Sequence, residues 1–310
     1  MKIFNSLIRS NCESAVALGY FDGVHLGHQR VITSAANEKQ NGLCTVVFTF
    51  EQRPLSVIDG RQQENITQKS EKHRLIEQSG ADILYSVDFN LIKDISPKDF
   101  VKAVLCDTFN AKKVFCGFNY HFGKNGEGDS EMLKTLCKEQ GIEVFTVPPV
   151  QQDGAVVSST RIRSLIKDGN IKEANRLLGH KYGFSAQITQ GNHIGRKIET
   201  PTINQHFEDG FILPRFGVYA TVVTIDGAKY CGVTNIGVKP TIGSYSPLSE
   251  TWLPEYSGES LYGKTVDVRL LEFIRPEKKF DSLHDLQTAI IDNGKTAIEI
   301  FDRYKKGKET

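Results

Sequence analysis

The stretch ALGYFDGVHLGHQRVI, residues 17–32, places the narrowest limits on how this chain folds locally. An apolar run typical of a buried strand leads into it, and a helical pattern follows it. Three glycines interrupt the stretch, so the backbone can turn sharply between strand and helix. Unpaired N–H groups and the positive end of the helix dipole then lie at the turn, where phosphate binds well. The glycine spacing is not Gly-x-Gly-x-x-Gly, so it matches a dinucleotide-binding fingerprint poorly.

Two histidines add chemistry to this turn. His25 and His28 are three residues apart, so both imidazoles lie on one face of the first helical turn, and Gly27 leaves room for a ligand to reach the backbone. A zinc site would need a third ligand, and none is nearby in the sequence. Donation of hydrogen bonds to a phosphoryl group suits the pair better, because negative charge develops on phosphoryl oxygens during transfer. A helix start with two solvated histidines is the alternative.

A second anion-binding pattern is VSSTRIR, residues 157–163. Hydroxyl groups precede two arginines at the start of a helical pattern, so Ser159 or Thr160 can cap the helix while Arg161 or Arg163 reaches anionic oxygens. An ordinary capped helix with exposed arginines would look the same. The VSSTRIR pattern lies at the other end of the same predicted α/β segment as the histidine pair, and this pairing favours a phosphate site over an ordinary helix start.

The order of the elements predicts two domains. Up to Leu178, apolar β-type runs alternate with helical patterns, which indicates a parallel sheet covered on both faces. From Phe184 to Phe273, short β-type runs follow one another, with a hairpin signal at Asp226-Gly227, so we expect a small barrel or sandwich. The tail after it reads as one or two amphipathic helices. We therefore expect an α/β domain over residues 1–182 and a β domain over residues 183–310.

Composition excludes several classes of protein. The 310 residues carry 38 basic and 37 acidic side chains, a net charge of +1, so no global field draws the chain to nucleic acid or to a membrane surface. The N-terminal apolar stretch is too short for a secretory signal, and no window approaches a membrane span. The six cysteines are scattered without a Cys-x-x-Cys pair, so we expect reduced thiols in a cytoplasmic protein.

These motifs carry a resemblance to a known family. GYFDGVHLGH with SSTRIR resembles the HxGH nucleotidyltransferase superfamily, and VFTFEQRP, CGFNYHFGKNGEGD and the later β-type runs narrow it to the bacterial riboflavin kinase/FAD synthetase family. The resemblance covers nearly the whole chain. It implies a Rossmann-like nucleotidyltransferase domain, followed by a small riboflavin-kinase-like β-barrel with a C-terminal helix.

For the first domain, the resemblance implies an FMN adenylyltransferase, which makes FAD and pyrophosphate from ATP and FMN. His25 and His28 would hold the ATP phosphates, Asn119 would lie at the nucleotide and flavin site, and Mg²⁺ or another divalent cation would share the charge. The sequence reads Arg53 where the family usually has histidine, which we interpret as a changed contact. By the same resemblance, Ser159, Thr160 and Arg163 would clamp pyrophosphate, and Gly19, Phe21, Asp22, Gly23, Gly27 and Arg161 would bind nucleotide.

For the second domain, the resemblance implies a riboflavin kinase that converts riboflavin and ATP to FMN. Gly195 begins its phosphate loop, Thr202 and Asn204 would hold the metal and phosphates, and Glu250 would act as base toward the ribityl hydroxyl. The loop departs from the family at residues 198–200, where a glycine becomes Glu199, and Trp252 replaces a histidine that could either close the flavin slot or only pack. We therefore hypothesise a weak or lost kinase activity.

Three alternatives remain open. A fully bifunctional riboflavin kinase/FAD synthetase would tolerate these departures as family-level variation. Another adenylyltransferase of the superfamily would act on a pantetheine or nicotinate nucleotide, but such enzymes usually lack the barrel. A non-catalytic flavin-binding regulator is the third alternative. The pyrophosphate clamp counts against it, because such a protein would need none. The sequence does not fix the oligomeric state.

Overall fold

The computed structural model describes residues 1–54, 64–190, 200–238 and 246–307. The chain divides into two units, Met1–Ser159 and Thr160–Thr310. Helix α6 (Ser159–Lys167) begins at this division, and α7 (Ile171–Leu178) follows it before the first barrel strand. The boundary expected after residue 182 stays a prediction. Within the described ranges, no helix is both long and apolar enough to cross a membrane.

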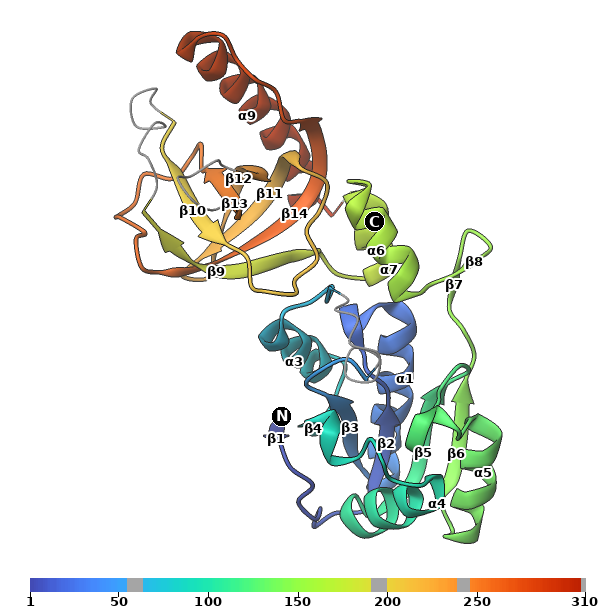
Figure 1. Ribbon diagram of the computed structural model, residues 1–310. Coiled ribbons are helices and arrows are strands. Elements are labelled where there is room, and N and C mark those ends of the chain that lie inside the picture. The colour runs from blue at the N-terminus through green and yellow to red at the C-terminus, as the bar shows by residue number, and fades with distance from the viewer. Residues whose placement is uncertain (55–63, 191–199, 239–245, 308–310) are drawn as a thin grey trace. The chain divides into compact units, whose positions relative to one another are not determined.

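A parallel sheet of six strands forms the centre of the first unit (Figure 1). Its order is β1-β4-β3-β2-β5-β6, so β2 has β3 on one side and β5 on the other. The direction of strand addition reverses there, and such a switch point opens a crevice at the carboxyl ends of the strands. A separate short hairpin joins β7 and β8. The strands of this unit are β1 (Lys2–Phe4), β2 (Ser14–Leu18), β3 (Cys44–Phe50), β4 (Ile83–Val87), β5 (Ala111–Gly117), β6 (Glu143–Val147), β7 (Gln151–Gln152) and β8 (Ala155–Val156).

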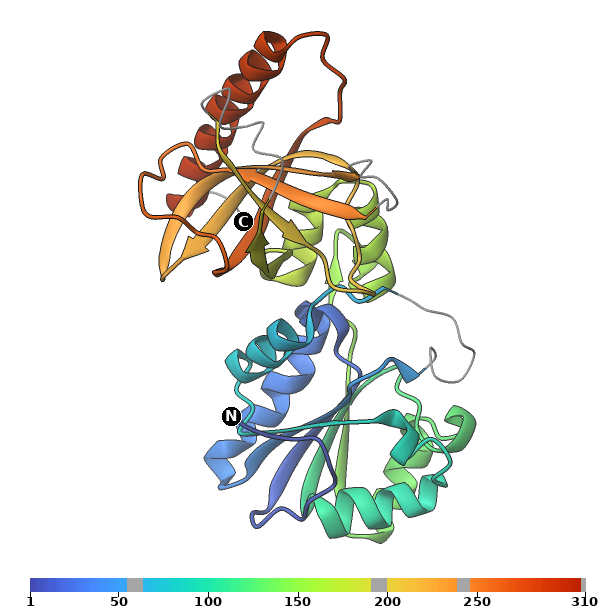
Figure 2. The same ribbon diagram turned by 60° about the vertical axis from the view of Figure 1, so that its left-hand side comes forward.

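Helices cover both faces of this sheet, as Figure 2 also shows. Ala15 and Ala17 of β2 belong to the core under α1 and α3, whereas Val16 and Leu18 belong to the core under the π-helix and α5. This alternation follows from the two-residue period of a strand, and it explains why β2 is buried throughout. The helices are α1 (Leu26–Ala36), α3 (Lys69–Gln78), α4 (Pro97–Asp99), the π-helix η4 (Phe100–Thr108), α5 (Ser130–Glu139) and the short 3₁₀ helices η1 (Asp22–Val24), η2 (Asn37–Asn41), η3 (Phe89–Leu91) and η5 (Lys124–Gly126).

The second unit is a closed barrel, ordered β10-β13-β12-β11-β14-β9, with antiparallel neighbours. The predicted hairpin at Asp226-Gly227 is confirmed, because both residues have positive φ and join β11 to β12. The tail forms one helix, α9 (Leu283–Lys305), which contacts β11, β12 and β14. The strands are β9 (Gly183–Thr189), β10 (Thr202–His206), β11 (Gly217–Ile225), β12 (Ala228–Val238), β13 (Pro247–Trp252) and β14 (Thr265–Pro276).

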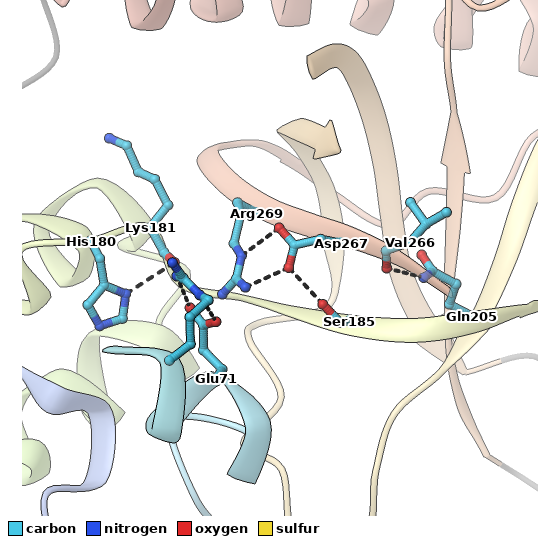
Figure 3. A network of polar contacts seen from close by, with 9 residues as sticks. Glu71, His180, Lys181, Ser185, Gln205, Val266, Asp267 and Arg269 are labelled. Atoms are coloured by element: carbon cyan, nitrogen blue, oxygen red, sulfur yellow. Dashed lines mark hydrogen bonds and ion pairs between the residues drawn. The ribbon is translucent and has the colours of Figure 1, made fainter. Parts of the chain in front are cut away.

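Side-chain hydrogen bonds reinforce the closure of the barrel. Figure 3 shows the Gln205 amide donating to the carbonyl oxygen of Val266 on β14, at 2.9 Å. Nearby, the Ser185 hydroxyl donates to Asp267 at 2.8 Å, and Arg269 donates to the same carboxylate (Figure 3). These contacts join β9, β10 and β14, where the last strand of the barrel meets the first.

The cysteine expectation is wrong at one pair. Cys12 and Cys44 form a disulfide, with their Cα atoms 6.3 Å apart. The physical reason is the register of β2 and β3: Ser14 pairs with Cys44, and the Cys44 N–H donates to the Glu13 carbonyl, so Cys12 lies beside Cys44. A sequence separation of 32 residues hides this neighbourhood. The other four cysteines are thiols.

The disulfide predicts a stability that depends on redox conditions. Cys12→Ser is expected to lower the unfolding free energy of the oxidised protein by on the order of 3 kcal/mol, because the bridge restricts the unfolded chain. Urea unfolding with and without a dithiol reductant measures this. Reductant should destabilise the wild type and leave Cys12→Ser unaffected. Cys106→Ser, at a thiol, is the matched control, and an unchanged wild-type midpoint on reduction would contradict the prediction.

Candidate active site

The glycine-rich turn lies at the carboxyl end of β2, beside the switch point of the sheet. Phe21, Gly23 and Val24 all have positive φ, so the backbone doubles back between the strand and α1. The Phe21 ring folds over Gly19, where a Cβ atom would stand only 2.8 Å from the ring. A side chain at position 19 would therefore displace the Phe21 ring.

His25 caps helix α1. Its Nδ1 accepts a hydrogen bond from the His28 backbone N–H at 3.3 Å, so a neutral His25 carries its proton on Nε2 and presents a donor there. The two imidazoles stack with centroids 3.6 Å apart, and a Cβ on Gly27 would come within 3.1 Å of the His25 ring. The pair is thus arranged as the spacing predicts, and Gly27 makes room for it.

Buried hydrogen bonds hold the glycine-rich turn in place. The Asp22 side chain is 4% exposed, and its Oδ1 accepts a hydrogen bond from the Ile66 N–H at 2.9 Å. The Gly23 N–H donates to the Thr67 hydroxyl at 3.4 Å. The Ser159 hydroxyl donates to the Asp22 carbonyl at 3.1 Å, although 137 residues separate them. Ser159, from the second predicted motif, therefore contacts the histidine turn at Asp22 within the first unit.

Asn119 follows β5, which is the other strand beside the switch point. Leu18 of β2 pairs with Cys116 of β5, so the segments after these residues leave the sheet at the same edge. Asn119 is exposed there, with its Oδ1 next to Gly117. The structure thus places Asn119 at the edge that carries the histidine turn.

The hydroxyl and arginine cluster continues from Ser159 into α6, within the second unit. Thr160 is exposed, whereas Arg163 is 6% exposed. Arg161 makes an ion pair with Glu173 of α7 at 3.3 Å, and Arg176 binds the same carboxylate at 2.8 Å. Arg161 therefore joins α6 to α7.

In the barrel, the register brings the predicted kinase residues together. Asn204 of β10 is paired with Glu250 of β13, whose other neighbour is Asn235 of β12. Residues paired across strands lie on the same face, so Asn204, Glu250 and Asn235 form one row. Thr202 is paired with Trp252 two positions along, on that same face. Gly195 lies outside the described residues.

This row lies on the outer face of the barrel. The alternate residue Thr251 points inward, where its hydroxyl is 2.8 Å from Thr234, which in turn is 2.9 Å from Thr221. Trp252 packs against α9: a Cβ on Gly294 would be 2.7 Å from its ring. Trp252 therefore packs against α9, and its closing of a flavin slot stays a prediction.

Two buried oxygens in this motif are of a kind that a divalent cation accepts as ligands. Asn204 Oδ1 and Thr200 Oγ1 make no hydrogen bond within the described part of the chain, and their residues are 5% and 2% exposed. Amide, carbonyl and hydroxyl oxygens are ligands that Mg²⁺ accepts beside substrate phosphates. Thr200 was missed by the sequence reasoning, although it lies two residues before Thr202 in the same motif.

The site also contains a residue that the motifs did not reveal. Lys72 of α3 is 7% exposed and lies next to the histidine turn, with its Nζ 4.1 Å from the Tyr20 ring centroid. A signal was present: Lys72 precedes Ile76 by four residues, so it shares the buried face of α3 with an apolar side chain.

Comparison with known proteins agrees with this architecture. The family model described as FAD synthetase matches residues 7–161, and the one described as riboflavin kinase matches residues 178–301. A bifunctional riboflavin kinase/FMN adenylyltransferase from Bacillus subtilis is 34% identical over 95% of this chain and 94% of its own. One from Escherichia coli is 31% identical over 92% of each chain. A solved structure described as a macrolide-efflux protein from Streptococcus pneumoniae has a TM-score of 0.86 and 32% identity, covering 95% of this chain and 97% of that one.

Fold and site together define a Rossmann-like nucleotidyltransferase domain followed by a kinase-like barrel. The chain belongs to the bifunctional riboflavin kinase/FMN adenylyltransferase family.

Proposed function

We propose that the first unit transfers the adenylyl group of ATP to FMN, giving FAD and pyrophosphate. The observation that carries this proposal is the stacked His25–His28 pair at the start of α1, in the turn where Ser159 donates to Asp22, beside the switch point of a parallel sheet. Imidazole and backbone N–H donors at this position can stabilise the charge that develops on the α-phosphoryl oxygens.

Adenylyl transfer from ATP to FMN needs no covalent intermediate with the protein. The phosphate of FMN is already ionised at neutral pH, so attack on the α-phosphorus needs positioning and charge stabilisation rather than a strong base. His25 and His28 would donate to the transferred group, while Ser159, Thr160 and Arg163 would hold the leaving pyrophosphate. Bound Mg²⁺ would share the phosphate charge.

A second candidate function is riboflavin kinase activity in the barrel. It is supported by the Asn204–Glu250 pairing and by the buried oxygens of Asn204 and Thr200. Glu250 would accept the proton of the ribityl hydroxyl, and Thr202, Asn204 and Thr200 would hold Mg²⁺ and the ATP phosphates. Together the two steps would convert riboflavin to FAD in the cytoplasm, where ATP is available.

One assay tests both functions. Purified protein, ATP and Mg²⁺ are incubated with FMN and, separately, with riboflavin, and the flavins are separated by chromatography. FAD from FMN supports the adenylyl-transfer site, and its absence would overturn that proposal. FMN or FAD from riboflavin supports an active kinase. FAD from FMN together with no product from riboflavin would instead support the weakened kinase that the departures at residues 198–200 predict.

A further inference from the structure

The amine of Lys72 joins two strand ends beneath the histidine turn. Its Nζ lies 4.1 Å from the centroid of the Tyr20 ring and donates to the Phe50 carbonyl oxygen at 3.3 Å. Tyr20 follows β2 by two residues, and Phe50 is the last residue of β3. One buried cation from α3 therefore contacts both neighbouring strands at the edge where the turn begins.

Charged groups surround this amine from three elements. The Asp22 carboxylate, from the turn after β2, favours the ammonium form. Lys69 on α3 opposes it, and Lys69 is itself paired with Glu51, which follows β3. Burial lowers the pKa of His73, also on α3, and the charge of Lys72 lowers it further. Burial is the main influence on Lys72, and it lowers the pKa of the amine to about 7.

Asp22 connects this amine to the reacting groups. Asp22 holds the Ile66 N–H through its side chain and the Ser159 hydroxyl through its carbonyl, and it precedes His25 by three residues. The Lys72 ammonium attracts the Asp22 carboxylate, and this attraction is lost when the amine is neutral. Losing that charge would loosen the turn that places His25 and His28.

We infer that Lys72 is a positioning residue for adenylyl transfer, whose ammonium holds the Asp22 turn, and with it the two histidines, against the ends of β2 and β3. The inference rests on the proposed function. In this inference Lys72 does not contact the substrate. The rate of adenylyl transfer therefore depends on the protonation of a side chain that does not touch the reacting atoms.

The test measures kcat for FAD formation from FMN and ATP between pH 6 and 9. The wild-type rate is expected to fall as pH rises through the pKa of Lys72, about 7. Lys72→Met is expected to be about 10- to 100-fold slower at pH 6, because small displacements of reacting groups cost rate steeply, and to lack this fall. A Lys72→Met enzyme with the wild-type rate and pH profile would overturn the inference.

A second variant leaves Lys72 in place. Lys69 lies one turn before it and is exposed, and its like charge lowers the pKa of Lys72. Lys69→Met is therefore expected to move the alkaline fall in rate to higher pH. An unmoved profile would overturn the inference even if Lys72→Met fails to fold. A wild type that makes no FAD at any pH would overturn the proposed function together with the inference, so the two failures are distinguishable.

Stability provides a readout that does not depend on activity. The pKa of Lys72 is lower in the folded chain, about 7, than its ordinary value of 10.5, so the folded state binds fewer protons between these values. Unfolding free energy should therefore rise with pH across this window in the wild type. Lys72→Met should lack that part of the rise, and an identical rise in both proteins would contradict the lowered pKa of the Lys72 amine.

Discussion

His28→Ala is expected to slow FAD formation from FMN and ATP by about 100- to 1,000-fold, the usual effect of removing one donor to a transition-state oxygen. The loss should fall on kcat, because the donor acts most strongly when charge builds on the α-phosphoryl group. His28 is the better residue to change, since His25 also caps α1 and its loss would destabilise the helix. Chromatographic measurement of FAD against time gives kcat and KM.

His284→Ala is the matched control for this prediction. His284 is an exposed histidine in the first turn of α9, in the other unit, and its replacement should leave FAD formation unchanged. Thermal unfolding of both variants shows whether the fold is retained. If His28→Ala folds and keeps a rate within about threefold of wild type, the histidine pair does not stabilise the transition state, and the site must be sought elsewhere along the sheet edge.

Glu250→Gln is expected to lower FMN formation from riboflavin by about 100- to 10,000-fold, because an alcohol that attacks phosphorus must lose its proton to a base. Glutamine keeps the size of the side chain, so the row with Asn204 and Asn235 should persist. FAD formation from added FMN should be unaffected, since it uses the first unit. Separate assays with riboflavin and with FMN measure the two steps.

Fluorescence of Trp252, the only tryptophan of the chain, distinguishes a loss of riboflavin binding from a loss of the reaction step. Trp252 lies two residues from Glu250 on the same face, so bound riboflavin should quench its fluorescence. Equal quenching in wild type and Glu250→Gln, with the rate lost, indicates a role in the reaction step. Glu259→Gln, at an exposed glutamate after β13, is the control and should retain the rate. Full kinase activity in Glu250→Gln would exclude Glu250 as the base.

Local features of the fold were predictable because short-range rules govern them. Ser96 caps α4 and Asp129 caps α5, as their places before helical patterns predict. Gly42 and Gly141 adopt positive φ just beyond helices, and Asp226-Gly227 makes the hairpin turn. The strand, turn and helix around His25 were predictable for the same reason, because the glycines and histidines that shape them lie within one turn.

Features that depend on pairing between distant segments could not be predicted from the sequence. Edge strand β1 lies beside β4, far along the chain, and carries no strong pattern of its own. The choice between barrel and sandwich depends on whether β9 pairs with both β10 and β14, which periodicity does not reveal. The disulfide of Cys12 and Cys44 likewise follows from the register of two parallel strands.

An α/β unit followed by a β unit, with a glycine-rich turn predicted to hold phosphate, can be read from the amino-acid sequence, because glycine conformations, helix caps and the spacing of two histidines are local properties. Which distant groups contact that turn depends on the tertiary structure. Ser159 reaches Asp22, Lys72 lies under Tyr20, and Asn204 stands beside Glu250 because sheet order and strand register bring them together. Such neighbourhoods arise from burial and hydrogen bonding summed over whole strands, which no single motif encodes.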